Sequence, residues 1–424
     1  MNGSDLNSFP LEARKNKRVI LENMALLFSE PRVRASREKI ISNPTVFIGS
    51  KLGFKMNLHF FKKTLFVFVA SLLFFGLHAE EDFHFKIVDE VIGKYRQRHQ
   101  VPGVAVILYY EGVPYFFSFG LANLMTRAPV TLDTIFELGS ITKSFTAILL
   151  ALEALKGTVR LNDRAELFLP GLHGFNGPFS EVTLLQLATH TAGFPHDVSL
   201  KLPSYAQAIQ YLKNWSPSYP IGTHYQYSNF GFGLLGLALE SASRKKYVEL
   251  LSLGILGPLQ MNRTFIYVPE SLSVDYAQGY KKNGSPAPRW PITLIAAAGA
   301  LRSTAGDMTK FLAACLNLPG TPIQLSKAIE LTETIGFRIN SQRTQVMSWM
   351  KTEHEGYTIF AKNGGVTGFS TFMGYIPEYK TGIVILANKN ANNTAAGQNI
   401  LQRLGDRLTR MNRPVKKIEK TLNK

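Results

Sequence analysis

The sequence predicts an α+β fold, in which one antiparallel sheet flanked by helices is formed from both ends of the chain around an inserted, mostly helical domain. The middle of the chain, about 180–260, has helical spacing broken by Pro and Gly. Strands at both ends with helices between them are typical of this architecture. The β-rich runs on which the prediction depends lie at 104–110, 115–119, 358–361, 369–376 and 382–387.

Size and composition limit the possible functions. The chain has 424 residues, of which 45% are hydrophobic and 18% charged, enough for one large or two closely packed domains. The net charge of +17 favours anionic substrates. No arginine-rich stripe with interleaved aromatic residues is present, so we expect no nucleic-acid partner. The lone Cys315 is expected to be a buried thiol, and we expect a monomer that needs no cofactor.

Residues 56–79 have the pattern of a signal peptide. A basic stretch starts at Met56, an apolar run follows over 65–77, and Leu77-His-Ala79 resembles a cleavage site. The apolar run is shorter than the about 20 residues of a membrane span, although an uncleaved anchor is the alternative. We therefore expect export to the periplasm, cleavage after Ala79 and no stable membrane insertion. Residues 1–55 are interpreted as an extension outside the mature protein.

The first predicted elements follow in order. Apolar spacing predicts a helix over 83–99, which Pro102 stops. The pair Glu111-Gly112 separates the first two β-rich runs and predicts a hairpin. A helix is expected to begin at Ser140 and to end at Gly157.

The C-terminal part supplies the remaining strands. Pro377-Glu-Tyr-Lys380 is interpreted as a turn between the last two strands, and a final helix is expected around Ile400 to Met411. A hydrolase domain over 80–424 results, with a sheet lobe at about 80–139 and 295–412. The helical lobe is expected at about 140–294.

Three short motifs stand in one order: Ser140-Ile-Thr-Lys143, Tyr227-Ser-Asn229 and Lys362-Asn-Gly364. Together they supply a nucleophile, two amines, a phenol and an amide, which is what acyl transfer through a covalent serine intermediate requires. Each motif alone is weak, because Ser-x-x-Lys also occurs at Ser36, Ser243 and Ser348.

Each motif has a catalytic and a purely structural interpretation. At a helix start, backbone N–H groups and the dipole would support an oxyanion near Ser140, and a crowded Lys143 could lose its proton and act as a base. Alternatively, Ser140 is a helix cap and Lys143 is solvated. Nearby ammonium groups would lower the pKa of Tyr227 and let its phenolate act as a base; otherwise its hydroxyl only tethers a loop. Asn229 either holds a substrate carbonyl with its amide nitrogen and an ammonium group with its oxygen, or it caps a helix.

The third motif is treated in the same way. Lys362 is expected to end a strand, and the N–H of Gly365 would be a second oxyanion donor beside that of Ser140; otherwise the motif is an ordinary turn. Neither Gly-x-Ser-x-Gly nor His-Glu-x-x-His is present, so no metal site is expected. His190 and His196 are interpreted as loop or capping residues.

With these motifs, the sequence resembles the class C β-lactamases within the penicillin-recognising serine hydrolases. The stretches 136–143, 185–193, 258–266 and 383–390 resemble that family too, and the resemblance runs from about Val101 to Asn393. It implies a β-lactamase/transpeptidase-like fold with Ser140 acylated and with Lys143 and Tyr227 moving protons. A β-lactam or a peptidoglycan-like acyl donor is the implied substrate.

The resemblance also implies the substrate contacts. These would be made by Asn229, Lys362, Asn363, Gly365 and Asn393. Two positions depart from the family's pattern, because Asn363 replaces the usual Thr and the usual arginine position is Ala396. A D-alanyl-D-alanine carboxypeptidase or esterase with the same machinery therefore stays open, as does a penicillin-binding sensor that does not turn over.

Overall fold

The computed structural model describes residues 83–196 and 204–412. The expected signal peptide at 56–79, the extension before it and the tail from Pro414 lie outside the described residues. The described part opens with a helix over 83–99, as the apolar spacing predicts. Cys315 is buried and unpaired, which confirms the expected thiol.

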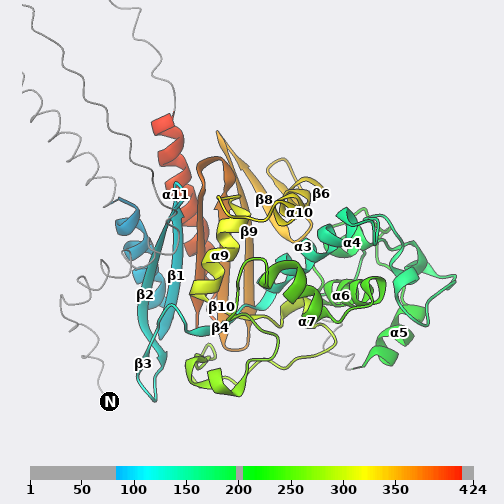
Figure 1. Cartoon of the computed structure of the whole chain (residues 1–424), viewed down its shortest axis with the longest axis horizontal. Coiled ribbons are helices and arrows are strands. Elements are labelled where there is room, and N and C mark those ends of the chain that lie inside the picture. The colour runs from blue at the N-terminus through cyan, green and yellow to red at the C-terminus, as the bar shows by residue number, and fades with distance from the viewer. Residues whose placement is uncertain (1–82, 197–203, 413–424) are drawn as a thin grey trace, which may run out of the picture. The chain divides into compact units, whose positions relative to one another are not determined.

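One nine-stranded antiparallel sheet forms the centre of the described fold (Figure 1), in the order β3-β2-β1-β11-β10-β9-β8-β7-β6. Because β1 pairs with β11, the first and last strands of the described residues are neighbours within the sheet, and the predicted fold class is confirmed. The three consecutive strands β6, β7 and β8 were not predicted. The strands are β1 (Gly103–Tyr110), β2 (Val113–Asn123), β3 (Ala128–Pro129), β6 (Gly336–Arg338), β7 (Arg343–Val346), β8 (Trp349–His354), β9 (Tyr357–Val366), β10 (Phe369–Ile376) and β11 (Thr381–Ala387).

The turn between β1 and β2 explains why these strands pair in register. Glu111 and Gly112 both have positive φ, +49° and +83°, which suits the right-handed twist of a two-residue hairpin. Along β1, alternate side chains enter two different cores: Val104 and Val106 share one with the helix over 83–99, whereas Ala105 and Ile107 belong to the core on the other face, where α9 (Ala305–Cys315) packs. The sheet is therefore buried on both faces here.

Most helices lie between the two groups of strands in the chain. α9 packs against β1 and β11, and α11 covers β9, β10 and β11. The helices are α3 (Thr142–Leu155), α4 (Leu184–Ala188), α5 (Tyr205–Asn214), α6 (Asn229–Ser243), α7 (Tyr247–Leu251), α8 (Ala296–Gly299), α9 (Ala305–Cys315), α10 (Ile323–Thr334) and α11 (Thr394–Asn412).

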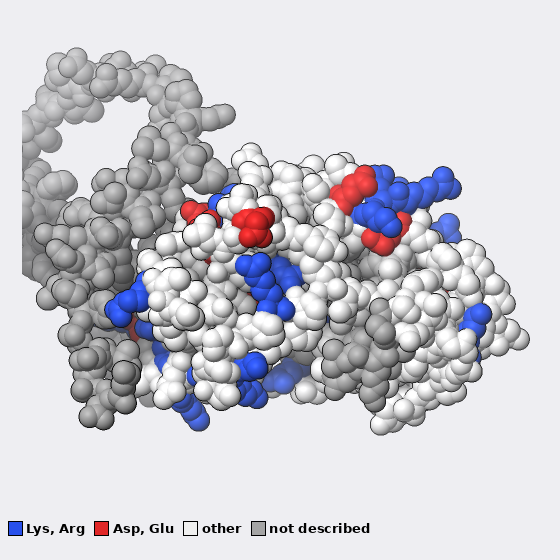
Figure 2. Space-filling model, turned by 90° about the horizontal axis from the view of Figure 1, so that it is seen from below, with Lys and Arg blue, Asp and Glu red and all other residues white. Residues whose placement is uncertain are grey.

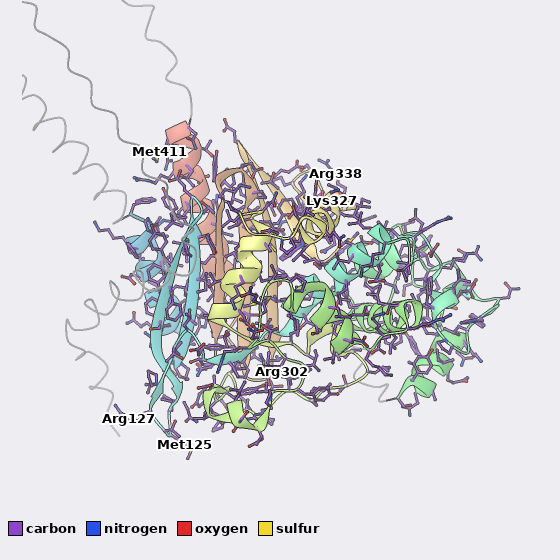
Figure 3. The ribbon with its side chains drawn as sticks, viewed as in Figure 1. Met125, Arg127, Arg302, Lys327, Arg338 and Met411 are labelled. Atoms are coloured by element: carbon purple, nitrogen blue, oxygen red, sulfur yellow. The ribbon has the colours of Figure 1, made fainter. Side chains whose placement is uncertain are left out.

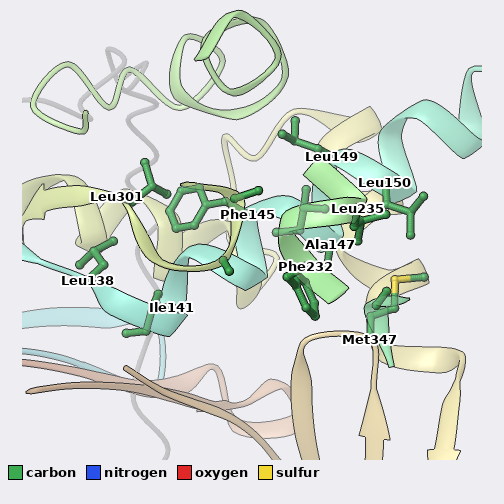
Figure 4. Packing of buried hydrophobic residues seen from close by; sticks show 14 of the residues in the cluster. Leu138, Ile141, Phe145, Ala147, Leu149, Leu150, Phe232, Leu235, Leu301 and Met347 are labelled. Atoms are coloured by element: carbon green, nitrogen blue, oxygen red, sulfur yellow. The ribbon is translucent and has the colours of Figure 1, made fainter. Parts of the chain in front are cut away.

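Helix α3 is the buried central helix of the helical lobe. Its apolar side chains meet those of α6 and of the chain around Leu301 (Figure 4). Phe145 stacks on Phe311 of α9 with ring centroids 4.0 Å apart. Aromatic pairs of this kind add about 0.5–1.5 kcal/mol beyond area burial. The helix that carries Lys143 is therefore held firmly from several sides.

Candidate active site

Ser140 lies in a short 3-10 helix, Gly139–Ile141, directly before α3. The predicted α-helical start at Ser140 is thus displaced by two residues, to Thr142. Gly139 has φ +54°, where a side chain is strained, and it makes the tight connection from β4 (Ile135–Glu137) into the helix possible. The Leu138 N–H donates to Leu301 O at 2.8 Å, which fixes the backbone two residues before the serine.

A second sheet of two strands includes the strand that precedes this segment. β4 pairs with β5 (Arg302–Thr304), so that Glu137 lies opposite Arg302, which is labelled in Figure 3. Both side chains are buried, with Glu137 Oε1 3.7 Å from Arg302 Nη2. The same oxygen accepts from Tyr276 Oη at 2.6 Å. These contacts tie β4, which leads into the Ser140 segment, to β5 and to Tyr276.

The Ser140 hydroxyl is the meeting point of two motifs. Lys143 Nζ lies 3.1 Å from Ser140 Oγ, and the Tyr227 hydroxyl lies 2.7 Å from it. The first contact follows from helical spacing, because residues three apart share a face. The second joins residues 87 positions apart in the chain, which the sequence alone could not place.

Lys143 is completely buried, with 0% of its surface exposed. Its Nζ donates to Asn229 Oδ1 at 2.8 Å and to Ala298 O at 2.7 Å. Burial, followed by the positive charge of Lys362, lowers the pKa of Lys143 well below its ordinary value. A neutral amine beside a serine hydroxyl can accept its proton. The Ala298 carbonyl was not foreseen, since a backbone acceptor leaves no signal in the sequence.

The expected lowering of the Tyr227 pKa is wrong. Burial raises the pKa of this phenol above its ordinary value, even though the hydrogen bond with Ser140 acts in the opposite direction. Lys143 Nζ and Lys362 Nζ each lie 4.9 Å from the centroid of the Tyr227 ring. The phenol is therefore kept neutral, able to donate or relay a proton rather than to act as a phenolate.

Asn229 is the first residue of α6, and Ser228 is the residue that caps this helix. The Ser228 hydroxyl accepts from the Gly231 N–H at 3.3 Å. The capping interpretation of Asn229 is therefore wrong, and its side-chain oxygen instead receives the Lys143 amine.

Strand β9 brings the third motif against Ser140. Its pairing with β8 ends at Ala361, and beyond that point its backbone runs beside Gly139 and Ser140. A Cβ added at Gly364 would lie 2.1 Å from Leu138 O and 3.1 Å from Ser140 N. A Cβ added at Gly139 would lie 2.7 Å from Gly365 N. At this seam, where the backbone of β9 touches the backbone of residues 138–140, there is no room for a side chain at Gly139 or Gly364.

Lys362 is 7% exposed and lies under Tyr227, whereas Asn363 and Gly365 are exposed. Burial lowers the pKa of Lys362 to about 7. Its charge therefore changes near neutral pH, where an anionic ligand would favour the ammonium form.

Basic side chains outnumber acidic ones on the face of the molecule shown in Figure 2, in line with the net charge of +17.

Known proteins with similar sequences share one family with this chain. A beta-lactamase family model matches residues 88–406. The chain belongs to the beta-lactamase family. It is 32% identical over 365 residues to a beta-lactamase from Psychrobacter immobilis, covering 78% of this chain and 90% of the relative. It is 30% identical over 343 residues to a beta-lactamase from Escherichia coli (strain K12), covering 73% and 90%.

Solved structures confirm the resemblance to class C members of the beta-lactamase family. A class C beta-lactamase in complex with cefoxitin superposes with a TM-score of 0.71 and 26% identity, over 76% of this chain and 99% of that one. A D-alanine carboxypeptidase from Burkholderia cenocepacia superposes with a TM-score of 0.70 and 32% identity, over 76% and 99%. The β-lactamase/transpeptidase-like fold is therefore confirmed.

One contact implied by the beta-lactamase resemblance is not supported. Asn393 is 1% exposed, and its amide nitrogen lies 3.2 Å from Ser370 O and 3.4 Å from Ile385 O. The residue holds the start of α11 against β10 and β11, so its amide nitrogen is occupied by backbone carbonyls. Because both partners are backbone carbonyls, this role could not be predicted from the residue types.

The other described Ser-x-x-Lys serines of this beta-lactamase family member have different surroundings. The Ser243 hydroxyl donates to Leu239 O within α6 at 2.7 Å, and Ser348 is fully buried. Ser36 lies outside the described residues. His190, interpreted from the sequence as a loop or capping residue, does lie in the turn after α4, and its ring is 4.4 Å from the Tyr227 ring, centroid to centroid.

Proposed function

We propose that this chain is a serine hydrolase that opens β-lactam rings through an acyl-enzyme on Ser140. The observation that carries the proposal is the contact of one serine hydroxyl with a buried amine at 3.1 Å and a buried phenol at 2.7 Å. Such a hydroxyl can lose its proton as it attacks a carbonyl carbon. Membership of the beta-lactamase family and class C structural relatives support the same reaction.

The depressed pKa of Lys143 and the raised pKa of Tyr227 suggest how protons move. Neutral Lys143 takes the proton of Ser140 as Oγ bonds to the β-lactam carbonyl carbon. Tyr227, kept as a phenol by burial, passes a proton to the ring nitrogen as the amide bond breaks, and it is reprotonated from Lys143. Water then attacks the ester along the reverse proton path, which releases the opened product.

Substrate contacts follow from the same geometry. The N–H groups of Ser140 and Gly365 stabilise the oxyanion, because Gly365 N lies against Gly139 in the seam with β9. The side-chain oxygen of Asn229 accepts from Lys143, and its amide nitrogen donates a hydrogen bond to the carbonyl of the substrate amide. Lys362, with a pKa of about 7, supports anionic donors, and Asn363 lies beside it on the exposed side of β9.

A second candidate function is hydrolysis of D-alanyl peptides or esters by the same residues. It is favoured by Asn363 in place of the usual threonine and by the structural relative described as a D-alanine carboxypeptidase. A penicillin-binding sensor that does not turn over is the third candidate. Tyr227 argues against the sensor, since its contact with Ser140 provides the proton path that deacylation needs.

Export to the periplasm is part of the proposal. The signal-like segment 56–79 supports it, with cleavage after Ala79. Among the described residues, no helix has the length and apolar character needed to cross a membrane.

Parallel rate measurements separate these functions. Steady-state hydrolysis of a chromogenic cephalosporin, a D-alanyl-D-alanine peptide and a p-nitrophenyl ester should be compared, with Ser140→Ala as the inactive control. We expect the cephalosporin to have the highest kcat/KM. Preference for the peptide or ester would favour the second candidate, and a stoichiometric burst without turnover would favour the sensor.

A further inference from the structure

His190 is held in an unusual backbone conformation next to the loop that carries Tyr227 and precedes α6. It follows α4 with φ +60°, in the left-handed region that favours glycine, and only 2% of its surface is exposed. A strained non-glycine residue persists only where surrounding contacts over-determine it, and such residues cluster at functional sites. The contacts that hold His190 lead to the loop that carries Tyr227.

Four consecutive residues of that loop, 225–228, contact His190, the first through an edge-on ring contact of Tyr225 with centroids 5.9 Å apart. The Gln226 N–H donates to His190 O at 2.7 Å, and the Ser228 N–H donates to His190 Nδ1 at 3.1 Å. Between these two bonds, the imidazole and the Tyr227 ring are 4.4 Å apart with planes tilted by 38°. His190 therefore holds the backbone on either side of Tyr227 by hydrogen bonds and packs against the Tyr227 ring.

The imidazole must be neutral to make these contacts. Because Nδ1 accepts an N–H, the ring proton is on Nε2, which is buried without a hydrogen-bond partner among the described residues. Burial lowers the pKa of His190 well below its ordinary value, and the charges of Lys362 and Lys143 lower it further. Phe232, 5.0 Å away between centroids, packs on the same ring and also faces the Lys143 amine at 5.7 Å.

We propose that His190 is a positioning residue that holds the Tyr227 hydroxyl on Ser140 Oγ during acyl transfer, an inference that rests on the proposed function. His190 contacts the loop before α6 and Phe232 of α6, and among the described residues no hydrogen bond joins it to Ser140, so it acts through Tyr227. Removing it would let the phenol move from its 2.7 Å contact with the nucleophile. A displacement of about 1 Å can cost about 100-fold in rate.

The test is a double-mutant cycle on the acylation rate constant, measured by stopped flow with a chromogenic cephalosporin. His190→Gly relieves the backbone strain but removes the ring and the Ser228 acceptor; we expect a 10- to 100-fold slower acylation with little change in substrate binding. In a Tyr227→Phe background the same substitution should cost less than about threefold, because the group being positioned is already gone.

Two further variants keep the test decisive. His190→Asn can adopt a positive φ and accept the Ser228 N–H but leaves the Tyr227 ring uncovered, so it should lose less than His190→Gly and again only when Tyr227 is present. If His190→Gly does not fold, the comparison of His190→Asn with and without Tyr227→Phe decides the question by itself. Gln260→Gly, at another non-glycine with φ +53°, is the matched control and should acylate normally.

The experiment distinguishes failure of the positioning role of His190 from failure of the proposed function. If wild-type protein shows no adduct on Ser140, the proposed function fails. If the wild type is acylated but both His190 variants acylate at its rate, or lose the same factor in the Tyr227→Phe background, the positioning role is wrong.

Discussion

The seam between strand β9 and Ser140 can be perturbed with a single methyl group. In Gly364→Ala, the new Cβ would lie 2.1 Å from Leu138 O and 2.3 Å from Thr371 Oγ1. Real Cβ atoms essentially never come closer than 3.0 Å to another heavy atom. The two backbones must therefore separate by about 0.9 Å, the difference between 2.1 and 3.0 Å.

This separation should affect both stability and catalysis. It strains or breaks the hydrogen bond from Thr371 Oγ1 to Leu138 O, 2.7 Å long, worth about 1 kcal/mol. Overpacking adds about 1–3 kcal/mol, so the free energy of unfolding should fall by about 2–4 kcal/mol. Because Ser140 N lies in the same seam, the oxyanion donors move apart and acylation should slow by about 100-fold.

Gly365→Ala is the matched control, because a Cβ there meets nothing within 4 Å. Its stability should stay within about 0.5 kcal/mol of the wild type. Urea denaturation and stopped-flow acylation by a chromogenic cephalosporin measure both variants. The reasoning is refuted if Gly364→Ala is as stable and as fast as the wild type, or if both variants lose equal stability.

Three further predictions concern charge, specificity and processing. Because the pKa of Lys362 is lowered to about 7, its ammonium form is lost as pH rises through 7, so the ratio of kcat/KM for a penicillin to that for a neutral ester should fall there; a flat ratio, or one unchanged by Lys362→Met, would contradict this. Asn363→Thr should raise kcat/KM for penicillins about ten- to a hundredfold and leave neutral esters nearly unchanged, since a hydrogen bond to a charged group contributes about 1.5–3 kcal/mol; equal gains for both would show that this position does not set specificity. N-terminal sequencing of exported protein should begin at Glu80, and recovery of residues 1–55 would refute the processing scheme.

The strands with strong patterns were predictable, and the weakly buried ones were not. β10 and β11 are buried at every residue, and β1 and β2 flank a turn with clear chemistry, so their runs stand out. The strands β6 and β8 are mostly exposed or half-buried, so their residues carry little apolar alternation. The sheet edge beyond β9 was therefore missed.

The site was predictable where motifs carry the chemistry and not where tertiary contacts decide it. Ser140, Lys143 and Tyr227 could be named from their types and order, and their contacts are short. The raised pKa of Tyr227 depends on burial, which spacing does not report. The occupied amide of Asn393 depends on backbone partners, which the sequence does not identify.

The most direct test of the account is to locate the covalent intermediate. Protein mixed with a slowly hydrolysed β-lactam should be quenched, digested and analysed by mass spectrometry, with Ser140→Ala treated in parallel. We expect one added acyl group on the peptide that contains Ser140 and none in the variant. An adduct on Ser36, Ser243 or Ser348, or normal turnover by Ser140→Ala, would contradict the account.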